Sequence, residues 1–266
     1  MFLFFLSIIV LLVLFAATHE QRWFKKILFY YFPQYLRPIS HKLKPINIYF
    51  NQLTPEKRKD FNWRAYYFLD TTSIEFRHFG PAQLINFNAV RYLIASVATQ
   101  MTLFLTEDCF DAFNRIIFYP DTYYSPLTGK YHKGETNPGA GLIILSWESF
   151  KSGFQSENDG VNLLIHEFAH ALWLENKLFD YEIFSDSAFR NYERIAGQYF
   201  SEFGEQSNFL RRYAYKNKEE FFAVVVENFF ERPHEFKKEL PNLYTSVAAL
   251  FNQDPTMYVS RGYFPT

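Results

Sequence analysis

The segment from Val161 to Trp173 constrains the fold more than any other part of the chain. Its apolar residues recur at the spacing of an α-helix, and Asp159 and Gly160 supply a region in which such a helix can begin. His166 and His170 are four residues apart, so the helix places both imidazoles on one face, one turn from each other. Two imidazoles on an apolar helix bring four ring nitrogens that need partners. A bound metal ion provides such partners, and hydrogen bonds within a protein core are the alternative.

Residues 166–170 read HEFAH, which is an H-E-x-x-H motif. Two imidazoles at this spacing can hold one zinc ion at about 2.0 to 2.1 Å each, while the Glu between them reaches the reacting water instead of the metal. The pair His234-Glu235 begins in the same way, but Lys238 stands where the second His is required, so we expect a surface segment there. The motif therefore predicts that its two histidines bind a metal and that Glu167 is the general base.

A catalytic zinc site takes three protein ligands and leaves the fourth position to water. The chain has a single cysteine, Cys109, whose acidic neighbours disfavour the thiolate, so the third ligand must be a His or a carboxylate. A second helix is expected from Asn217, a good N-cap residue, to a point before Pro233. Three acidic residues of this helix are candidates, and spacing alone does not decide among them: Glu219, Glu220 and Glu227.

These motifs resemble those of the zinc-dependent peptidases of the Mlc titration factor A family, whose catalytic core is similar to the protease domain of anthrax lethal factor. The resemblance rests on Leu164 to His170, on Gly141 to Trp147 and on Tyr213 to Ala223, and it covers roughly residues 85 to 255. After His170 the chain reads ALWLE, where relatives tend to have a Leu-Asp step and a glycine-bearing loop.

The resemblance implies a zincin-like fold with Zn²⁺ as the cofactor and Glu220 as the third ligand beside His166 and His170. It implies that Glu227 orients a ligand histidine. It also implies that the phenol of Tyr213 donates a hydrogen bond to the oxyanion that forms during the reaction.

The activity implied by the resemblance is hydrolysis of peptide bonds, with a peptide or protein as the substrate. The alternative is a metal-containing regulatory protein that sequesters a transcriptional repressor, or another partner, without cleaving it. Retention of Glu167 argues against a purely structural metal site, because a structural zinc ion needs no general base. The net charge of -1 and the pI near 6.7 carry no electrostatic sign of nucleic-acid binding, so no DNA or RNA partner is expected.

The first 17 residues carry no charged side chain. At about 1.5 Å per residue a helix of this length reaches about 25 Å, and we expect residues 1–20 to form a transmembrane anchor. Arg22, Lys25 and Lys26 follow the apolar run, so the positive-inside rule predicts a single-pass membrane protein with a cytoplasmic catalytic domain. A cleaved signal peptide and a buried or peripheral helix are the alternatives. The aromatic residues from Trp23 to Phe32 predict an interfacial belt or a helix packed on the domain.

Prolines at positions 33, 38 and 45 predict a juxtamembrane linker over residues 21–45. One metallopeptidase domain is expected over 46–266, because 266 residues are near the upper limit of a single hydrophobic core. The predicted class is α+β, mostly helical, with a small sheet beside the active-site helix. Helical spacing predicts helices over residues 55–69 and 82–105, and again along most of the chain from residue 159.

Two apolar runs are typical of strands, RIIFY at 115–119 and GLIILSW at 141–147. Between them, residues 123–138 are rich in Gly, Pro, Lys and Tyr, which predicts a loop or a hairpin. The second run is a candidate for binding an extended substrate by edge pairing, and a core strand is the alternative.

Overall fold

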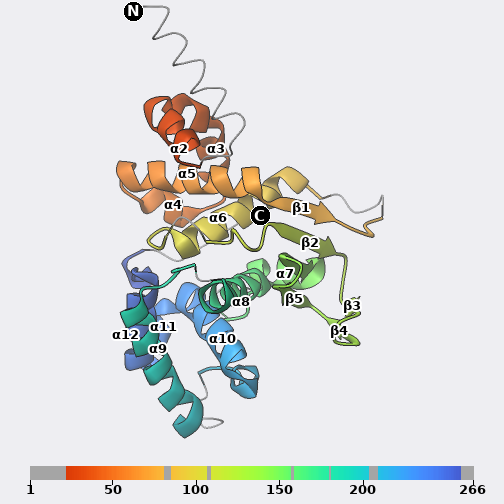
Figure 1. Ribbon diagram of the computed structural model, residues 1–266, viewed down its shortest axis with the longest axis vertical. Coiled ribbons are helices and arrows are strands. Elements are labelled where there is room, and N and C mark those ends of the chain that lie inside the picture. The colour runs from red at the N-terminus through yellow and green to blue at the C-terminus, as the bar shows by residue number, and fades with distance from the viewer. Residues whose placement is uncertain are drawn as a thin grey trace, which may run out of the picture.

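The computed structural model describes residues 22–80, 85–106, 109–156, 159–179, 181–203 and 209–258. Within them the chain is α+β and mostly helical, with a four-stranded and a two-stranded sheet beside the helices (Figure 1). The predicted class is confirmed for this part of the chain. The α-helices are α2 (Arg22–Tyr31), α3 (Arg37–Leu43), α4 (Ile48–Gln52), α5 (Pro55–Thr71), α6 (Phe87–Thr102), α7 (Trp147–Gln155), α8 (Leu163–Leu178), α9 (Asp186–Gln198), α10 (Lys218–Glu231), α11 (Pro233–Glu239) and α12 (Pro241–Phe251).

The main sheet has the strand order β1-β2-β6-β5. Strands β1 (Ser73–Phe76), β2 (Arg115–Tyr119) and β6 (Leu142–Ser146) run parallel, and β5 (Gly134–Asn137) pairs antiparallel with β6. The predicted strands over 115–119 and 141–147 are confirmed as β2 and β6. Their near-continuous apolar sequences suit them to the middle of the sheet, where both faces are covered.

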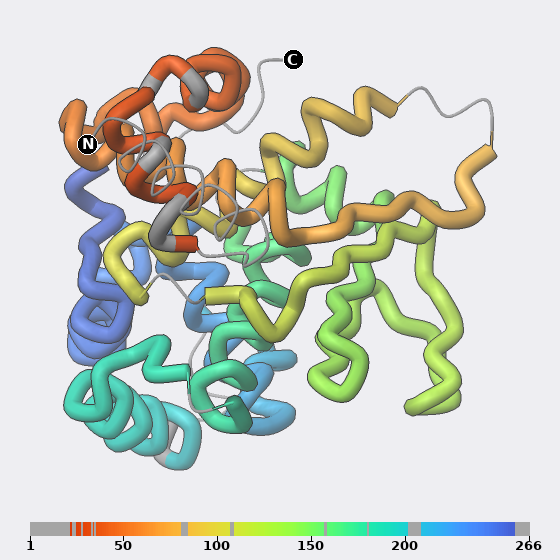
Figure 2. Tube along the Cα trace, turned by 45° about the horizontal axis from the view of Figure 1, so that its top comes forward, coloured from red at the N-terminus to blue at the C-terminus, as the bar shows by residue number. Residues whose placement is uncertain are grey.

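Strand β6 lies between β2 and β5, so it has no free edge for a substrate. The core-strand alternative is therefore correct for this segment, and β5 is the edge strand instead. Strands β3 (Tyr123–Ser125) and β4 (Lys130–His132) form a separate antiparallel hairpin. Figure 2 shows this yellow-green hairpin extending away from the helical body beside the sheet.

Helices α5 and α6 follow the sequence pattern with small shifts. Thr54 caps α5 by accepting a hydrogen bond from the amide of Lys57 at 3.3 Å, and Pro55 takes the first helical position as predicted. Helix α6 begins at Phe87, five residues later than expected, because the side chain of Asn86 provides its N-cap.

Helices α8 and α10 pack against each other and carry the candidate site. The N-cap of α8 is Asn162, whose side chain accepts from the amide of Ile165 at 3.2 Å. The expected start at Asp159-Gly160 is too early, since Gly160 has a left-handed φ of 72° that a helical residue does not adopt. Helix α10 begins after Asn217 as predicted, with the Asn217 side chain accepting from the amide of Glu220 at 2.8 Å.

The segment expected to be a linker is helical over most of its described length. Prolines 33 and 38 lie in the first turns of a 3-10 turn, η1 (Pro33–Leu36), and of α3, where a missing amide hydrogen costs nothing. Leu36, Ile39 and Leu43 are buried in the main hydrophobic core. Residues 36–43 therefore contribute to the packed interior, and the predicted domain boundary at residue 46 stays a prediction.

The predicted transmembrane anchor, residues 1–20, lies outside the described residues. Among the helices that are described, none is both long enough and apolar enough to cross a membrane.

Candidate metal centre

Three side chains from two helices converge on one point. His166 and His170 project from α8, and Glu220 projects from the first turn of α10. The Nε2 atoms of the two histidines are 3.1 Å apart, and Oε2 of Glu220 lies 3.1 Å from His166 Nε2 and 3.3 Å from His170 Nε2. The structure thus brings together the three residues that the motif and the resemblance indicate.

The donor set fits a tetrahedral metal ion. Ligand atoms at about 2.0 to 2.1 Å from a tetrahedral zinc ion lie about 3.3 to 3.4 Å from one another, close to the three separations found here. Two imidazole nitrogens and one carboxylate oxygen are ligands that zinc accepts, and three protein ligands leave one position open. The identity of the metal rests on this donor set, which other first-row ions also accept.

Glu220 stays ionised in spite of its burial. Burial by itself raises the pKa of a carboxyl group, but hydrogen bonds from His166 and His170, and from Tyr213 and Lys216, outweigh it and lower the pKa of Glu220 well below its usual range. Its Oε1 atom accepts from the Tyr213 hydroxyl at 2.7 Å and from Lys216 Nζ at 2.9 Å. One oxygen of Glu220 therefore faces the histidines, and the other is held by these two donors.

Glu167 lies beside the three ligands in a closely fitted position. Burial raises the pKa of Glu167, and the Thr136 hydroxyl donates to its Oε2 at 2.9 Å. Strand β5 passes so close that a Cβ atom added at Gly134 would overlap Oε1 of Glu167. A side chain at position 134 would therefore displace this carboxylate from its present position, and Thr136 of the same strand donates a hydrogen bond to it.

Glu227 holds the far side of the His166 ring. Its Oε1 atom lies 2.5 Å from His166 Nδ1, which is the orientation that the resemblance implies for this residue. Glu227 is fully buried, and Arg211 donates to its two oxygens at 2.6 and 2.8 Å. The amide of Asn162 donates to Oε2 at 2.8 Å. A bidentate guanidinium and a backbone amide thus fix the position of the buried Glu227 side chain.

A cavity of about 610 Å³ opens next to these groups. His166, Glu167 and Tyr213 line it together with Arg211. Its remaining walls come from the β4–β5 segment, from α7 and from the loop before α8, including Tyr131, Lys133, Glu148, Ser152 and Asp159. Tyr213 is 46% exposed, so its ring faces this cavity while its hydroxyl reaches Glu220.

Sequence reasoning did not find Arg211, Lys216, Gly134 or Thr136. The buried Glu227 implies a nearby cation, but Arg211 lies in an aperiodic segment that gives no hint of which cation it is. Gly134 and Thr136 lie on an edge strand without apolar residues, inside the region expected to be a loop or hairpin.

The remaining candidates lie apart from the centre. Glu219 is exposed, and His234 and Glu235 are exposed on α11 as predicted for a surface segment. Burial and the nearby Glu175 carboxylate raise the pKa of Cys109, which keeps it a thiol, in agreement with a structural role.

Comparison with known proteins gives several relatives of similar length. An uncharacterized protein of Synechocystis sp. is 24% identical over 228 residues, which are 78% of this chain and 80% of that protein. The Mlc titration factor A of Serratia proteamaculans is 26% identical over 188 residues, 63% of this chain and 71% of the relative. The Mlc titration factor A of Yersinia pestis is 25% identical over 171 residues, 57% of this chain and 62% of the relative.

A family model described as glucose-regulated metallo-peptidase M90 matches residues 19–252. The match includes both helices of the centre and most of the chain. It agrees with the resemblance to the Mlc titration factor A proteins that the motifs indicate. With this match, the chain belongs to the glucose-regulated metallo-peptidase M90 family.

Proposed function

We propose that this chain is a zinc-dependent peptidase that hydrolyses peptide bonds. The observation that carries the proposal is the triangle of donor atoms from His166, His170 and Glu220, with the buried Glu167 beside it. Zinc held there supplies a Lewis acid that polarises a carbonyl group and acidifies water. The other chemical tasks fall to side chains of the protein.

Glu167 is proposed as the general base. Its raised pKa strengthens it as a proton acceptor, and the hydrogen bond from Thr136 fixes the carboxylate beside the ligands. It takes the proton from the attacking water and then delivers it to the amine that leaves. Gly134 allows the carboxylate to lie against β5 during both transfers.

Tyr213 is proposed to stabilise the oxyanion. Burial and the hydrogen bond to Glu220 raise the pKa of Tyr213, so the phenol keeps its proton at neutral pH and can donate it in a hydrogen bond. In the structure the Tyr213 hydroxyl donates to Oε1 of Glu220, and Nζ of Lys216 donates to the same oxygen. If the Tyr213 side chain rotated toward the cavity to contact the oxyanion, Oε1 of Glu220 would therefore still accept a hydrogen bond from Lys216.

The substrate is proposed to be an extended peptide. Strand β5 is the edge of the main sheet, and its first residue, Gly134, lines the cavity beside Glu167. An edge strand offers free backbone groups to which an extended peptide can pair. The cavity is large enough for several side chains of such a peptide.

The proposal is tested with the full chain and its Glu167→Gln variant. We expect the parent to hold about one zinc ion per chain, given three ligands, and to cleave peptides from a chromogenic panel. The variant should keep the metal and lose turnover by about 10²- to 10⁴-fold, the range for removal of a general base. Glu235→Gln is the matched control, because it changes the exposed Glu of the other His-Glu pair, and it should leave turnover unchanged.

A second candidate is a regulatory protein that binds a partner without cleaving it. The relatives from Serratia and Yersinia carry the name Mlc titration factor A, which refers to titration of a protein and not to cleavage. Metal in both parent and variant, with no cleavage by either, would favour this candidate. Absence of bound metal from the parent would contradict both.

A further inference from the structure

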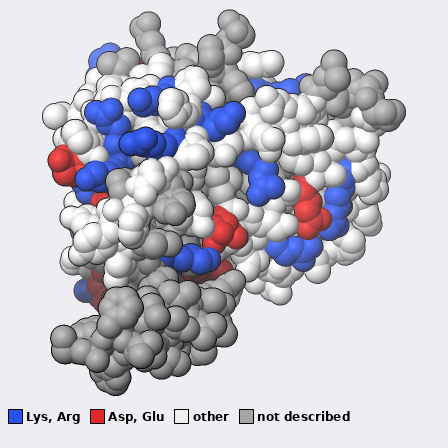
Figure 3. Space-filling model, turned by 90° about the horizontal axis from the view of Figure 1, so that it is seen from above, with Lys and Arg blue, Asp and Glu red and all other residues white. Residues whose placement is uncertain are grey.

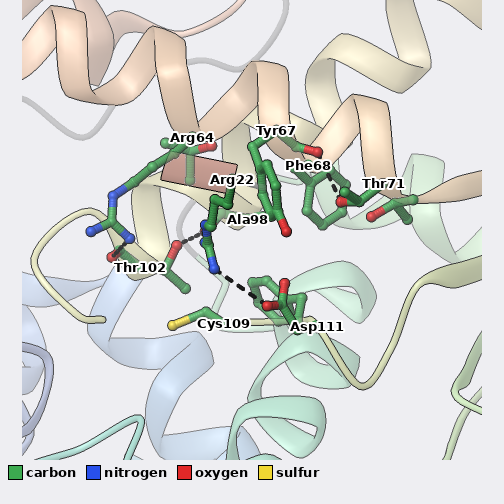
Figure 4. A pocket seen from close by; sticks show the side chains of 12 residues that line it. Arg22, Arg64, Tyr67, Phe68, Thr71, Ala98, Thr102, Cys109 and Asp111 are labelled. Carbon is green, nitrogen blue, oxygen red and sulfur yellow. Dashed lines mark hydrogen bonds and ion pairs between the residues drawn. The ribbon is translucent and has the colours of Figure 1, made fainter. Parts of the chain in front are cut away.

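Two charged residues of helix α2, Arg22 and Lys25, contact the rest of the protein. Arg22 donates to Asp111 at 3.3 Å, and its guanidinium lies 4.2 Å from the centre of the Tyr67 ring. Figure 4 shows this side chain reaching into a small cavity between α5 and α6. One turn later Lys25 donates to Asp70 at 2.7 Å. Two ion pairs therefore fix the orientation of the helix on α5 and on the loop after α6.

The opposite face of α2 is apolar and exposed. Ile27, Tyr30 and Tyr31 are 46%, 72% and 71% exposed, and their i, i+3, i+4 spacing makes one continuous stripe. The next residue, Phe32, is 47% exposed. We refer to these four residues as the α2 stripe. Phe29, on the inner face of the helix, packs against Trp63 and Tyr66, so α2 has apolar residues on its outer face as well as on its inner face.

The surroundings of the α2 stripe are strongly basic. Residues 21–55 contain six Lys or Arg and no Asp or Glu, although the whole chain has a net charge of -1. Three of these basic residues, Arg37, Lys42 and Lys44, are exposed on or next to α3. Viewed from above, where α2 and α3 face the viewer, blue side chains predominate over red ones (Figure 3).

We propose that the α2 stripe and the basic residues of α3 bind the surface of a membrane that contains anionic phospholipid. An exposed apolar stripe flanked by Lys and Arg is the pattern of helices that lie in the membrane interface, where the apolar side chains enter the boundary and the cations meet lipid phosphates. In the sequence, the uncharged residues 1–17 precede α2 by a few positions, so a second apolar segment lies close to it along the chain. This inference is independent of the peptidase activity.

The position of this surface keeps the candidate metal centre accessible. Helices α2 and α3 lie at one end of the molecule, and α9 and α10 lie at the other (Figure 1). The ligand Glu220 and the cavity-lining Tyr213 belong to α10 and to the turn before it. A chain bound through α2 therefore holds the centre away from the lipid surface.

The test uses the full chain with Tyr31→Cys in a Cys109→Ala background, so that residue 31 carries a single nitroxide label. The label at 31 is compared with one placed by Leu127→Cys, at an equally exposed apolar position on the β3–β4 hairpin. Each protein is added to vesicles of phosphatidylcholine alone or with about 30% phosphatidylglycerol, a content that makes the surface strongly negative. The collision rates of the nitroxide label with a water-soluble nickel reagent and with oxygen are measured, and their ratio reports the depth of the label in the membrane.

We expect anionic vesicles to lower the collision rate of the residue 31 label with the nickel reagent on the order of fivefold. The scale is set by binding to the membrane, which each basic residue near an anionic surface strengthens by about this factor. The residue 127 label should not change. The double change Lys42→Glu and Lys44→Glu, or high salt, should restore collision at residue 31.

Equal exposure of both labels on anionic vesicles would overturn the proposal. The proposal would also fail if the residue 31 label were shielded equally on neutral and anionic vesicles, with or without the Lys42 and Lys44 changes. That result would mean that another part of the chain, or a second copy of it, covers the α2 stripe. Shielding by duplex DNA without shielding by anionic vesicles would assign the surface to nucleic acid instead.

Discussion

At the scale of single residues, Arg211 holds the buried side chain of Glu227 in place. Its two guanidinium nitrogens donate to both oxygens of Glu227, which in turn holds Nδ1 of His166. An ionised carboxylate without a cation in this position would be costly. We therefore infer that Arg211 acts on the candidate metal centre through Glu227, as a positioning residue, although it is not one of the three candidate ligands.

Replacement of Arg211 should weaken metal binding. We expect Arg211→Met to lower zinc affinity by about 10- to 100-fold, the usual effect of losing an outer partner of a ligand histidine. Arg211→Lys keeps the charge but not the bidentate geometry, so its loss should be smaller. Competition with a chromogenic chelator measures the affinity, and melting of the metal-free protein checks that it folds. Arg212→Met, at the exposed neighbouring position, is the control, and an equal loss there would contradict the role of Arg211.

Glu231 provides a pH-dependent contribution to stability. Burial raises the pKa of Glu231 from 4.5 to about 8. The folded protein therefore retains this proton between those two values while the unfolded chain has lost it, so the contribution to stability falls as pH rises from about 4.5 to about 8. Glu231→Gln removes this dependence.

We expect Glu231→Gln to melt at the same temperature as the parent near pH 4.5 and at a higher temperature near pH 8.5. Each kcal/mol corresponds to about 2 to 4 °C for a chain of this size. Scanning calorimetry across this pH range measures the difference, with Glu235→Gln as an exposed control. A difference that stays constant across this pH range would show that Glu231 has an ordinary pKa in the folded protein.

The sequence predicts the residues of the centre that follow from local periodicity. His166, Glu167 and His170 come from one helical turn, and the seven-residue separation of Glu220 and Glu227 places both on one face of α10. Which of the two reaches the Nε2 atoms of the histidines depends on how α10 crosses α8, and periodicity contains no information about that crossing. The resemblance supplied Glu220, and the structure agrees with its placement.

At the scale of elements, the strands that sequence reasoning identified are those that are covered on both faces. Strands β2 and β6 have the apolar runs that such burial requires. Strand β5 has the polar sequence Gly-Glu-Thr-Asn, in keeping with its place at the edge of the sheet. Its Thr136 donates a hydrogen bond to Glu167, and its Glu135 accepts one from Tyr123 of the β3–β4 hairpin. A short polar edge strand is therefore the element that pattern analysis misses, and here it borders the candidate centre.

The start of α10 combines a helix cap with a ligand. The Asn217 side chain accepts from the amide of Glu220, whose own carboxylate faces the histidines. We expect Asn217→Ala to lower the free energy of unfolding by about 1 kcal/mol and also to weaken zinc binding, because the first turn that carries Glu220 frays.

Asn86→Ala is the matched control for Asn217→Ala. It removes the cap of α6, where Asn86 accepts from the amide of Ala89 at 3.1 Å, away from the centre. Chemical denaturation and chelator competition on both variants separate the two effects. Equal zinc affinity in the two variants would show that the α10 cap contributes stability alone.

At the scale of the whole molecule, the core begins earlier in the chain than the prolines suggest. Prolines 33 and 38 lie in the first turns of helical segments, whereas the sequence predicts a linker there. Proline occurs both in linkers and at the first positions of helices, so its presence alone does not distinguish the two. Leu43 is fully buried beside the residues of α5 and α6, and the family match also begins before this segment, at residue 19.

The contribution of α3 can be measured by truncating Leu43. We expect Leu43→Ala to lower the free energy of unfolding by about 2 to 5 kcal/mol, the usual cost of a cavity at a buried leucine. Leu127→Ala, at an exposed leucine, should have almost no effect. If urea denaturation gives the same stability for both variants, residues 21–45 behave as a linker after all.

The contact between β5 and Glu167 implies that turnover should depend on the length of a peptide substrate. Gly134 and Thr136 contact Glu167, the proposed general base, so a substrate peptide that paired with β5 as proposed would also stiffen the support of that carboxylate. Recognition and alignment then become a single event. A dipeptide too short to form this pairing should lose turnover as well as affinity, because the energy of distant contacts is used to organise the reacting groups.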